Sequence, residues 1–285
     1  MSTAQNLQAD WGAKLSVKPL EPTIGAEISG VDLAQPISDS VRDQIKSTLL
    51  EYKVVFFRDQ NIDVHQQAAF ASRFGKLYTH PNTSRNDKVA NIHKIQAVDF
   101  AKYDRARDHN TIEAGYHTDT SWRLVPTWGA VLRAVHLPEV GGDTLWVDAG
   151  AAYDGLSDEL KQRLEGLHVT HDFRPALNRV GLDYPIVAHP VVRTHRETGR
   201  KTLWVNFGMR PYIIGLGLEE NREILRTVLA AYQKPEHQVR FAWRPGSVAF
   251  WDNRAAVHIA IRNYGDFPRE MERVLIEEED TLSAL

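Results

Sequence analysis

The sequence has no cysteine, and this absence excludes disulfide bridges, thiolate metal sites and cysteine nucleophiles. No apolar run approaches the roughly 18 residues of a membrane span, and the opening MSTAQNLQADWGAK lacks the basic and then apolar pattern of a signal peptide. Neither sign of charge is in excess, since the net charge is only -3 over 285 residues. We therefore expect a cytoplasmic protein with no membrane partner and no nucleic-acid partner.

Short segments of β character run through the chain. Strand-like runs are KLSVKPL, GAEISGVDL and KVVFF near the start, and VRFAWRPG, SVAFWDNR, AAVHIAIR and MERVLIEE near the end. In between, WGAVLRAV and DTLWVDA are expected as strands joined by a turn in HLPEVGG, and IVAHPVVRTH and KTLWVNFG as a hairpin around RETGR. Many short strands without regular strand–helix alternation favour a mainly β fold with flanking helices and a double-stranded β-helix, or jelly-roll, core.

Four helices are expected between these strands. Ser38 is placed to cap a helix that runs to about Tyr52, and Asp63 to open a second one that runs through Phe74. A third begins at Ser157, and the segment 218–232 is amphipathic.

We expect one domain with two irregular excursions. Residues 1–13 are polar and are expected to be flexible, whereas residues 14–285 are expected to form a single jelly-roll domain. The segments near 80–115 and 168–186 have little periodicity, and long loops of this kind often act as lids.

His117 and Asp119 in GYHTDTSW are the first candidate metal ligands. Residues i and i+2 of a strand point to the same face, so both side chains could reach one ion. The triplet alone is weak, because 12 histidines would often meet an aspartate two places on by chance. Its aromatic neighbours Tyr116, Trp122 and Trp128 suit the mouth of an apolar cavity, although each could equally be plain core packing.

A competing triplet, His195-Arg196-Glu197, lies in the expected hairpin turn THRETGRK. A turn of this composition is typically solvated, so we expect these side chains to lie in a surface loop rather than at a metal.

His258 is a candidate third ligand. A lone histidine on an apolar strand is more often a hydrogen-bonded core residue, but here a buried strand and the polar turn Asp252-Asn253-Arg254 precede it. Such a turn often supports a site, although a structural salt bridge between Asp252 and Arg254 is equally compatible. Two histidines and one carboxylate are typical of non-haem Fe(II) oxygenases, in which three coordination positions stay open.

Arg269 and Arg273 stand four residues apart on the last expected strand. Their side chains would share one face, separated by roughly 13 Å, and each guanidinium could hold a separate anion. Surface salt bridges to Glu270 and Glu272 are the alternative, and the spacing alone favours them.

Taken together, these motifs resemble the TauD/TfdA family of Fe(II)/2-oxoglutarate-dependent dioxygenases. The resemblance includes HTD at 117–119, GGDTLW at 141–146, WDNR at 251–254, His258, and arginines 11 and 15 residues after it. The opening IGAEISGVDL and the segment VVFFRDQ are similar to the family too, so the resemblance covers nearly the whole chain.

The resemblance implies a role for each matching residue. His117, Asp119 and His258 match the iron ligands, and Thr144 and Arg269 match the pair that binds the far carboxylate of 2-oxoglutarate. Arg273 matches the residue that holds the anionic group of the substrate in taurine and alkylsulfate members, and His80 matches a histidine that assists it.

Three departures fall on the substrate side. Tyr116 stands where taurine-type members carry tryptophan, Glu113 stands where they carry asparagine, and Trp122 ends HTDTSW where phenylalanine is usual. We therefore expect these three residues to contact the substrate and do not expect taurine itself to be that substrate.

The expected activity is the hydroxylation of a small anionic organic molecule with Fe(II), 2-oxoglutarate and O2, with release of succinate and CO2. Sulfonates, sulfate esters, aryloxy acids and amino-acid derivatives all fit an arginine anchor. The resemblance also implies a homo-oligomer, either a dimer or a tetramer. Two alternatives remain on the residues alone: a jelly-roll hydrolase or isomerase using another metal, and a non-catalytic jelly-roll binding protein.

Overall fold

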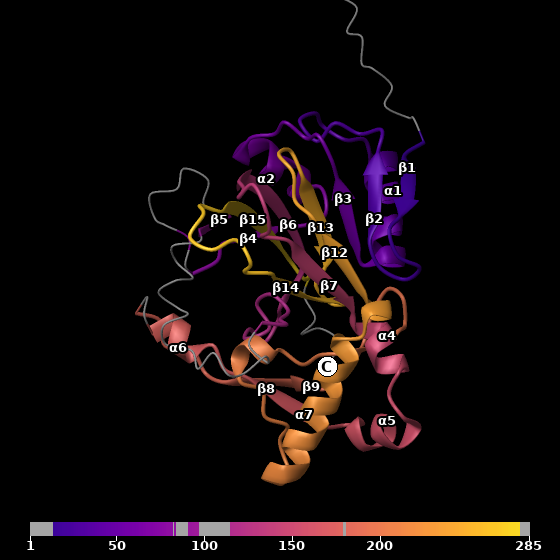
Figure 1. Cartoon of the computed structure of the whole chain (residues 1–285), viewed down its shortest axis with the longest axis vertical. Helices are drawn as coiled ribbons and strands as arrows, with labels where there is room; N and C mark the ends of the chain where they lie inside the picture. The colour runs from indigo at the N-terminus through magenta and orange to yellow at the C-terminus, as the bar shows by residue number, and fades with distance from the viewer. Residues whose placement is uncertain (1–13, 82, 84–90, 97–114, 179–180, 280–285) are drawn as a thin grey trace, which may run out of the picture.

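Sheets with helices on their outer sides make up the fold (Figure 1). The computed structural model describes residues 14–81, 83, 91–96, 115–178 and 181–279. The predicted flexible segment 1–13 and much of the predicted lid 80–115 therefore lie outside the described residues. None of the described helices is both long and apolar enough to span a membrane.

Two sheets form the centre of the molecule. The larger has the order β1-β2-β3-β13-β6-β15-β4, with β5 also paired to β15, and the smaller has the order β12-β7-β14. The strands of the large sheet are β1 (Ser16–Pro19), β2 (Ala26–Ser29), β3 (Val54–Phe57), β4 (Leu77–Tyr78), β5 (Ile92–Gln96), β6 (Thr127–His136), β13 (Val248–Asp252) and β15 (Glu270–Glu277). Those of the small sheet are β7 (Thr144–Asp148), β12 (Gln238–Phe241) and β14 (Ala256–Ala260).

Helices and two small hairpins surround these sheets. The helices are α1 (Asp39–Tyr52), α2 (Val64–Ser72), α4 (Ala149–Asp154), α5 (Asp158–Leu164), α6 (Arg174–Leu177) and α7 (Leu218–Tyr232), with short 3-10 turns at Phe207–Met209 and Pro235–His237. The hairpins pair β8 (His168–His171) with β9 (Val187–Pro190), and β10 (Val192–Thr194) with β11 (Lys201–Leu203). In Figure 1, α1 and α2 lie beside the large sheet, and α5 and α7 lie at the opposite end of the molecule.

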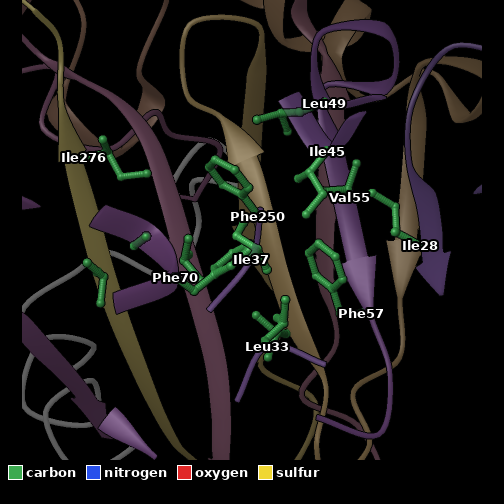
Figure 2. Close-up of a cluster of buried hydrophobic side chains, with 14 of the residues drawn as sticks. Ile28, Leu33, Ile37, Ile45, Leu49, Val55, Phe57, Phe70, Phe250 and Ile276 are labelled. Atoms are coloured by element: carbon green, nitrogen blue, oxygen red, sulfur yellow. The ribbon is translucent and has the colours of Figure 1, made fainter. Parts of the chain in front are cut away.

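Strand β3 explains how the core is divided. Successive side chains of a strand point to opposite faces. Phe56 therefore packs between the two sheets, stacked on Phe241 with ring centroids 3.9 Å apart, while Val55 and Phe57 belong to the cluster under α1 and α2 (Figure 2). All four residues of β3 are buried, and this is why KVVFF shows no polar alternation.

The predicted helix starts are confirmed. The side chain of Ser38 accepts a hydrogen bond from Val41 N at the start of α1, which ends at Tyr52 as expected. Asp63 forms a capping box with Gln66 at the start of α2, so both helices begin where a side-chain oxygen replaces the missing backbone acceptor.

Two connections differ from expectation. The strands on either side of HLPEVGG are present, but β6 lies in the large sheet and β7 in the small one, so the turn carries the chain between sheets. The predicted lid 168–186 contains strand β8 and helix α6. Strand β8 pairs with β9, which follows this segment in the chain. Pairing with a distant strand leaves no local signal in the sequence, and this explains why β8 escaped prediction.

Candidate metal centre

His117 and His258 lie side by side on adjacent extended segments. The backbone N–H of each donates to the carbonyl oxygen of the other at 2.9 Å, and the ring centroids are 4.1 Å apart. Asp119 Oδ1 lies 3.8 Å from His117 Nε2 and 4.0 Å from His258 Nε2. One potential ligand atom of each residue lies within 4.8 Å of the others. The structure thus brings the three predicted ligands together.

The surroundings of His258 favour its neutral form. On β14 it shares a face with Ala256, between the two sheets, and its ring lies against Trp146 and Trp251, with centroids at 6.3 and 4.9 Å. Burial, and then the neighbouring His117 and Arg273, lower the pKa of His258 well below its ordinary value. A neutral imidazole keeps the lone pair that a metal requires.

The donor set fits a divalent iron ion. His117 Nδ1 lies 2.7 Å from the carbonyl oxygen of Gly115, so Nδ1–H donates there and Nε2 carries the lone pair that faces Asp119. Asp119 Oδ2 and His258 Nδ1 are buried without a hydrogen-bond partner among the described residues. A buried carboxylate oxygen is costly to leave unpaired, and a cation held by two imidazoles and this carboxylate would compensate it.

Two asparagine side chains hold the backbone that carries the ligands. Asn253 Oδ1 accepts from Asp119 N at 2.9 Å, and its Nδ2 donates to the carbonyl oxygens of Asp119 and Thr127. Asn206 Nδ2 donates to the carbonyl oxygen of Thr118 at 3.0 Å. Both amides are buried, so they fix the HTD segment from two sides. The sequence predicted a supporting role for the polar turn that contains Asn253. It did not predict the role of Asn206, which follows a strand and belongs to no motif.

Arg273 reaches the same group of residues. Its Nη1 donates to Asp119 Oδ1 at 2.6 Å, and its Nε is buried without a partner among the described residues. The salt bridge to Glu272 that the spacing alone favoured does not form, because Glu272 pairs with Arg133 on the opposite face of β15. Arg273 therefore faces the interior beside the candidate ligands.

Thr144 and Arg269 are both buried near the start of β7. Arg269 Nε donates to the carbonyl oxygen of Gly142 at 3.1 Å, and Thr144 Oγ1 accepts from Trp243 Nε1 at 2.9 Å. No hydrogen bond from the two terminal nitrogens of Arg269 to another described residue is present, and these nitrogens form the fork that suits a carboxylate.

His80 and Trp122 lie together on the side of the site toward the segment 168–186. Their rings are 6.4 Å apart, and Trp122 stacks on Phe173 and meets Tyr184 edge-on. Burial, followed by the neighbouring His93, lowers the pKa of His80 to about 2, so this imidazole is neutral.

The family model described as taurine catabolism dioxygenase TauD, TfdA family matches residues 16–275. The chain belongs to this family. It is 32% identical to an alkylsulfatase of Acinetobacter baylyi, over 95% of this chain and 87% of that protein. It is 30% identical to an α-ketoglutarate-dependent sulfate ester dioxygenase of Pseudomonas putida, over 97% and 94%.

Solved structures agree with this assignment. The crystal structure of a taurine dioxygenase from Burkholderia xenovorans superposes with a TM-score of 0.80, at 34% identity, and covers 93% of this chain and 91% of that one. As a member of the TauD/TfdA family, the chain is a 2-oxoglutarate-dependent dioxygenase, an oxidoreductase that uses Fe(II), 2-oxoglutarate and O2.

Not every expected substrate contact of this TauD/TfdA protein lies at the centre. Tyr116 turns to the opposite side from His117, where its hydroxyl accepts from Gln238 and its ring packs near Tyr232 of α7. Glu113 lies outside the described residues. Trp128 packs in the cluster under α1 and α2, so its role is core packing.

Within the second triplet, His195 is buried, contrary to expectation, whereas Arg196 and Glu197 are exposed, as expected. His195 Nε2 lies 3.0 Å from Asp252 Oδ2, and both side chains are only 1% exposed. Arg254 pairs with Asp252 and with Glu197, so the salt bridge that the sequence left open as one reading of the polar turn is present. The prediction of a solvated loop at His195 was wrong because the sequence does not reveal what the hairpin packs against.

Proposed function

We propose that this dioxygenase hydroxylates a small organic anion held beside the group His117, Asp119 and His258, which would bind Fe(II). The observation that carries the proposal is the burial of Asp119 and His258 beside Arg273, a permanent cation that contacts Asp119. When bound, the iron supplies the redox chemistry that couples oxidative decarboxylation of 2-oxoglutarate to oxidation of a substrate C–H bond, releasing succinate and CO2.

The remaining residues bind and orient. Arg269 and Thr144 would hold the far carboxylate of 2-oxoglutarate, since the guanidinium fork of a buried arginine binds a carboxylate through two hydrogen bonds. Arg273, assisted by His80, would hold the anionic group of the substrate, and Trp122 would line the cavity and exclude water. Relatives named for sulfate esters, sulfonates and phenoxy acids support an anionic substrate.

We also propose that residues 14–285 form one domain whose two sheets make a double-stranded β-helix. The apolar cluster shared by the two facing sheets, with His258 on its edge, supports this arrangement.

Removing a ligand and removing an anchor should have different effects. His117→Ala should abolish both Fe(II) binding and 2-oxoglutarate-dependent succinate formation, because two ligands remain from a group of three. Arg273→Ala should raise the substrate KM by about tenfold or more and change the affinity for 2-oxoglutarate little, and Arg269→Ala should do the reverse. Succinate release, assayed with and without O2, measures turnover in His117→Ala and the substrate and 2-oxoglutarate dependence in the two arginine variants.

Two results would refute the proposal. Unchanged turnover in His117→Ala would remove the metal assignment, and equal losses of both affinities in the two arginine variants would remove the division of roles. Product formed without O2 and 2-oxoglutarate would indicate a hydrolase or isomerase, which the relatives do not support.

A further inference from the structure

His93 lies directly across from Arg273. Strand β5 pairs antiparallel with β15, and in that register His93 and Arg273 are partners. Residues opposite each other in an antiparallel pair project from the same face of the sheet. The His93 ring is also 4.6 Å from that of His80, so side chains from three separate segments meet at one point. No motif distinguishes His93 in the sequence.

Polar atoms at this point lack partners. His93 Nδ1 and Arg273 Nε are both buried, and neither has a hydrogen-bond partner within the described part of the chain. Buried polar atoms of folded proteins are almost always hydrogen-bonded. Two buried atoms without partners on directly paired residues therefore indicate that a polar ligand binds between or beside them.

The charges of the cluster suit a single anion. Burial, and then the charge of Arg273, lower the pKa of His93 to about 3, so His93 is neutral near pH 7, as is His80. The cluster thus combines one permanent cation with two neutral imidazoles. An arginine fork occupies two oxygens of an anion, and a neutral ring N–H can donate to a further oxygen. A carboxylate has only two oxygens, whereas a terminal SO3 group has three.

We propose that His93 binds the anionic group of the substrate together with Arg273 and His80, and that this subsite selects a terminal SO3 group over a carboxylate. The inference rests on the proposed function, in which Arg273 anchors the substrate. His93 is a specificity-determining residue in this role: it contacts the anion and takes no part in iron or 2-oxoglutarate binding.

The test compares the holoenzyme and its variants on three substrates of equal chain length: an alkyl sulfonate, an alkyl sulfate and an alkyl carboxylate. Succinate measures turnover on each, while released sulfite marks the sulfonate and released sulfate marks the ester. Wild type should prefer the two SO3 substrates. His93→Leu should raise their KM by about tenfold, with little change in kcat or in the affinity for 2-oxoglutarate, so that the preference over the carboxylate falls.

Two further variants make the comparison specific. Lys94→Leu alters the exposed neighbour on the same strand and should leave the preference unchanged. His93→Gln keeps an N–H donor and should restore part of the SO3 preference, which loss of packing alone would not explain.

The failures are distinguishable. Absence of 2-oxoglutarate-dependent succinate formation by wild type with every anion would overturn the proposed function itself. Turnover by wild type that favours the carboxylate, or a preference that His93→Leu leaves unchanged, would overturn only the role of His93.

Discussion

At the scale of single residues, the candidate metal ligands are positioned by two buried amide side chains that are not themselves part of the ligand group. Asn253 binds the backbone of Asp119 on both its N–H and its carbonyl oxygen, and also binds Thr127 on the neighbouring strand β6. The spacing between His117 and Asp119 therefore depends on a side chain 134 positions away from Asp119. Groups of this kind set ligand orientation and so tune metal affinity.

Asn253→Ala should weaken metal binding as well as folding. Three hydrogen bonds are lost at a fully buried position, which should cost about 2–4 kcal/mol of the free energy of unfolding. Mn(II) or Fe(II) should bind about 10–100-fold more weakly, measured by calorimetry under anaerobic conditions. Asn221→Ala is the matched control, since that buried amide binds Ile213 O away from the centre. It should lower stability alone, and an equal loss of metal affinity in both variants would contradict the positioning role.

At the scale of elements, the hairpin β10–β11 is anchored to the turn that follows β13. His195 at the end of β10 meets Asp252, and Arg254 joins Asp252 to Glu197 in the hairpin loop. Burial alone would raise the pKa of Asp252, but the charge and hydrogen bonds of Arg254 and the hydrogen bond with His195 lower it strongly. The carboxylate therefore stays ionised beside Asn253, and the hairpin stabilises the turn that holds Asp119.

His195→Ala should destabilise the protein far more than Glu197→Gln. His195 and Asp252 are 1% exposed, so removing the imidazole leaves a buried carboxylate with one fewer partner, at a cost of about 1–3 kcal/mol. Glu197 is 40% exposed, and its pairs with Arg254 and Lys46 are partly solvated, so its removal should cost less than about 1 kcal/mol. Urea unfolding measures both, and equal losses would show that the two contacts are equivalent.

Local sequence patterns predicted the helices and strands better than they predicted which other segments these elements pair with. Ser38 and Asp63 start helices because a capping side chain acts within its own turn, and β3 and β13 are apolar enough to be recognised alone. The candidate metal ligands could be predicted because their spacing matches that of a family. The burial of His195 and the position of His93 opposite Arg273 depend on which distant strands pair, and no local pattern encodes that.

At the scale of the whole molecule, several buried or half-buried histidines are in their neutral form. Burial is the main cause at each, and it lowers the pKa of His80 to about 2, those of His93 and His171 to about 3, and that of His189 to about 4. An unfolded chain takes up a proton at each histidine as the pH falls through about 6.5, whereas the folded protein does not until near its own lower pKa. Stability should therefore be greatest above about pH 6.5 and fall progressively toward pH 4.

His189→Gln isolates one of these contributions. His189 Nε2–H donates to the carbonyl oxygens of Ser121 and Arg123 at 2.9 Å, and a glutamine amide can donate there without titrating. Between pH 7.5 and 5.0, the variant should lose up to about 2 kcal/mol less of its free energy of unfolding than wild type. Urea unfolding of metal-free protein at the two pH values measures this, so that metal release at acid pH does not contribute. A wild-type pH dependence in His189→Gln would show that this imidazole is protonated in the folded protein.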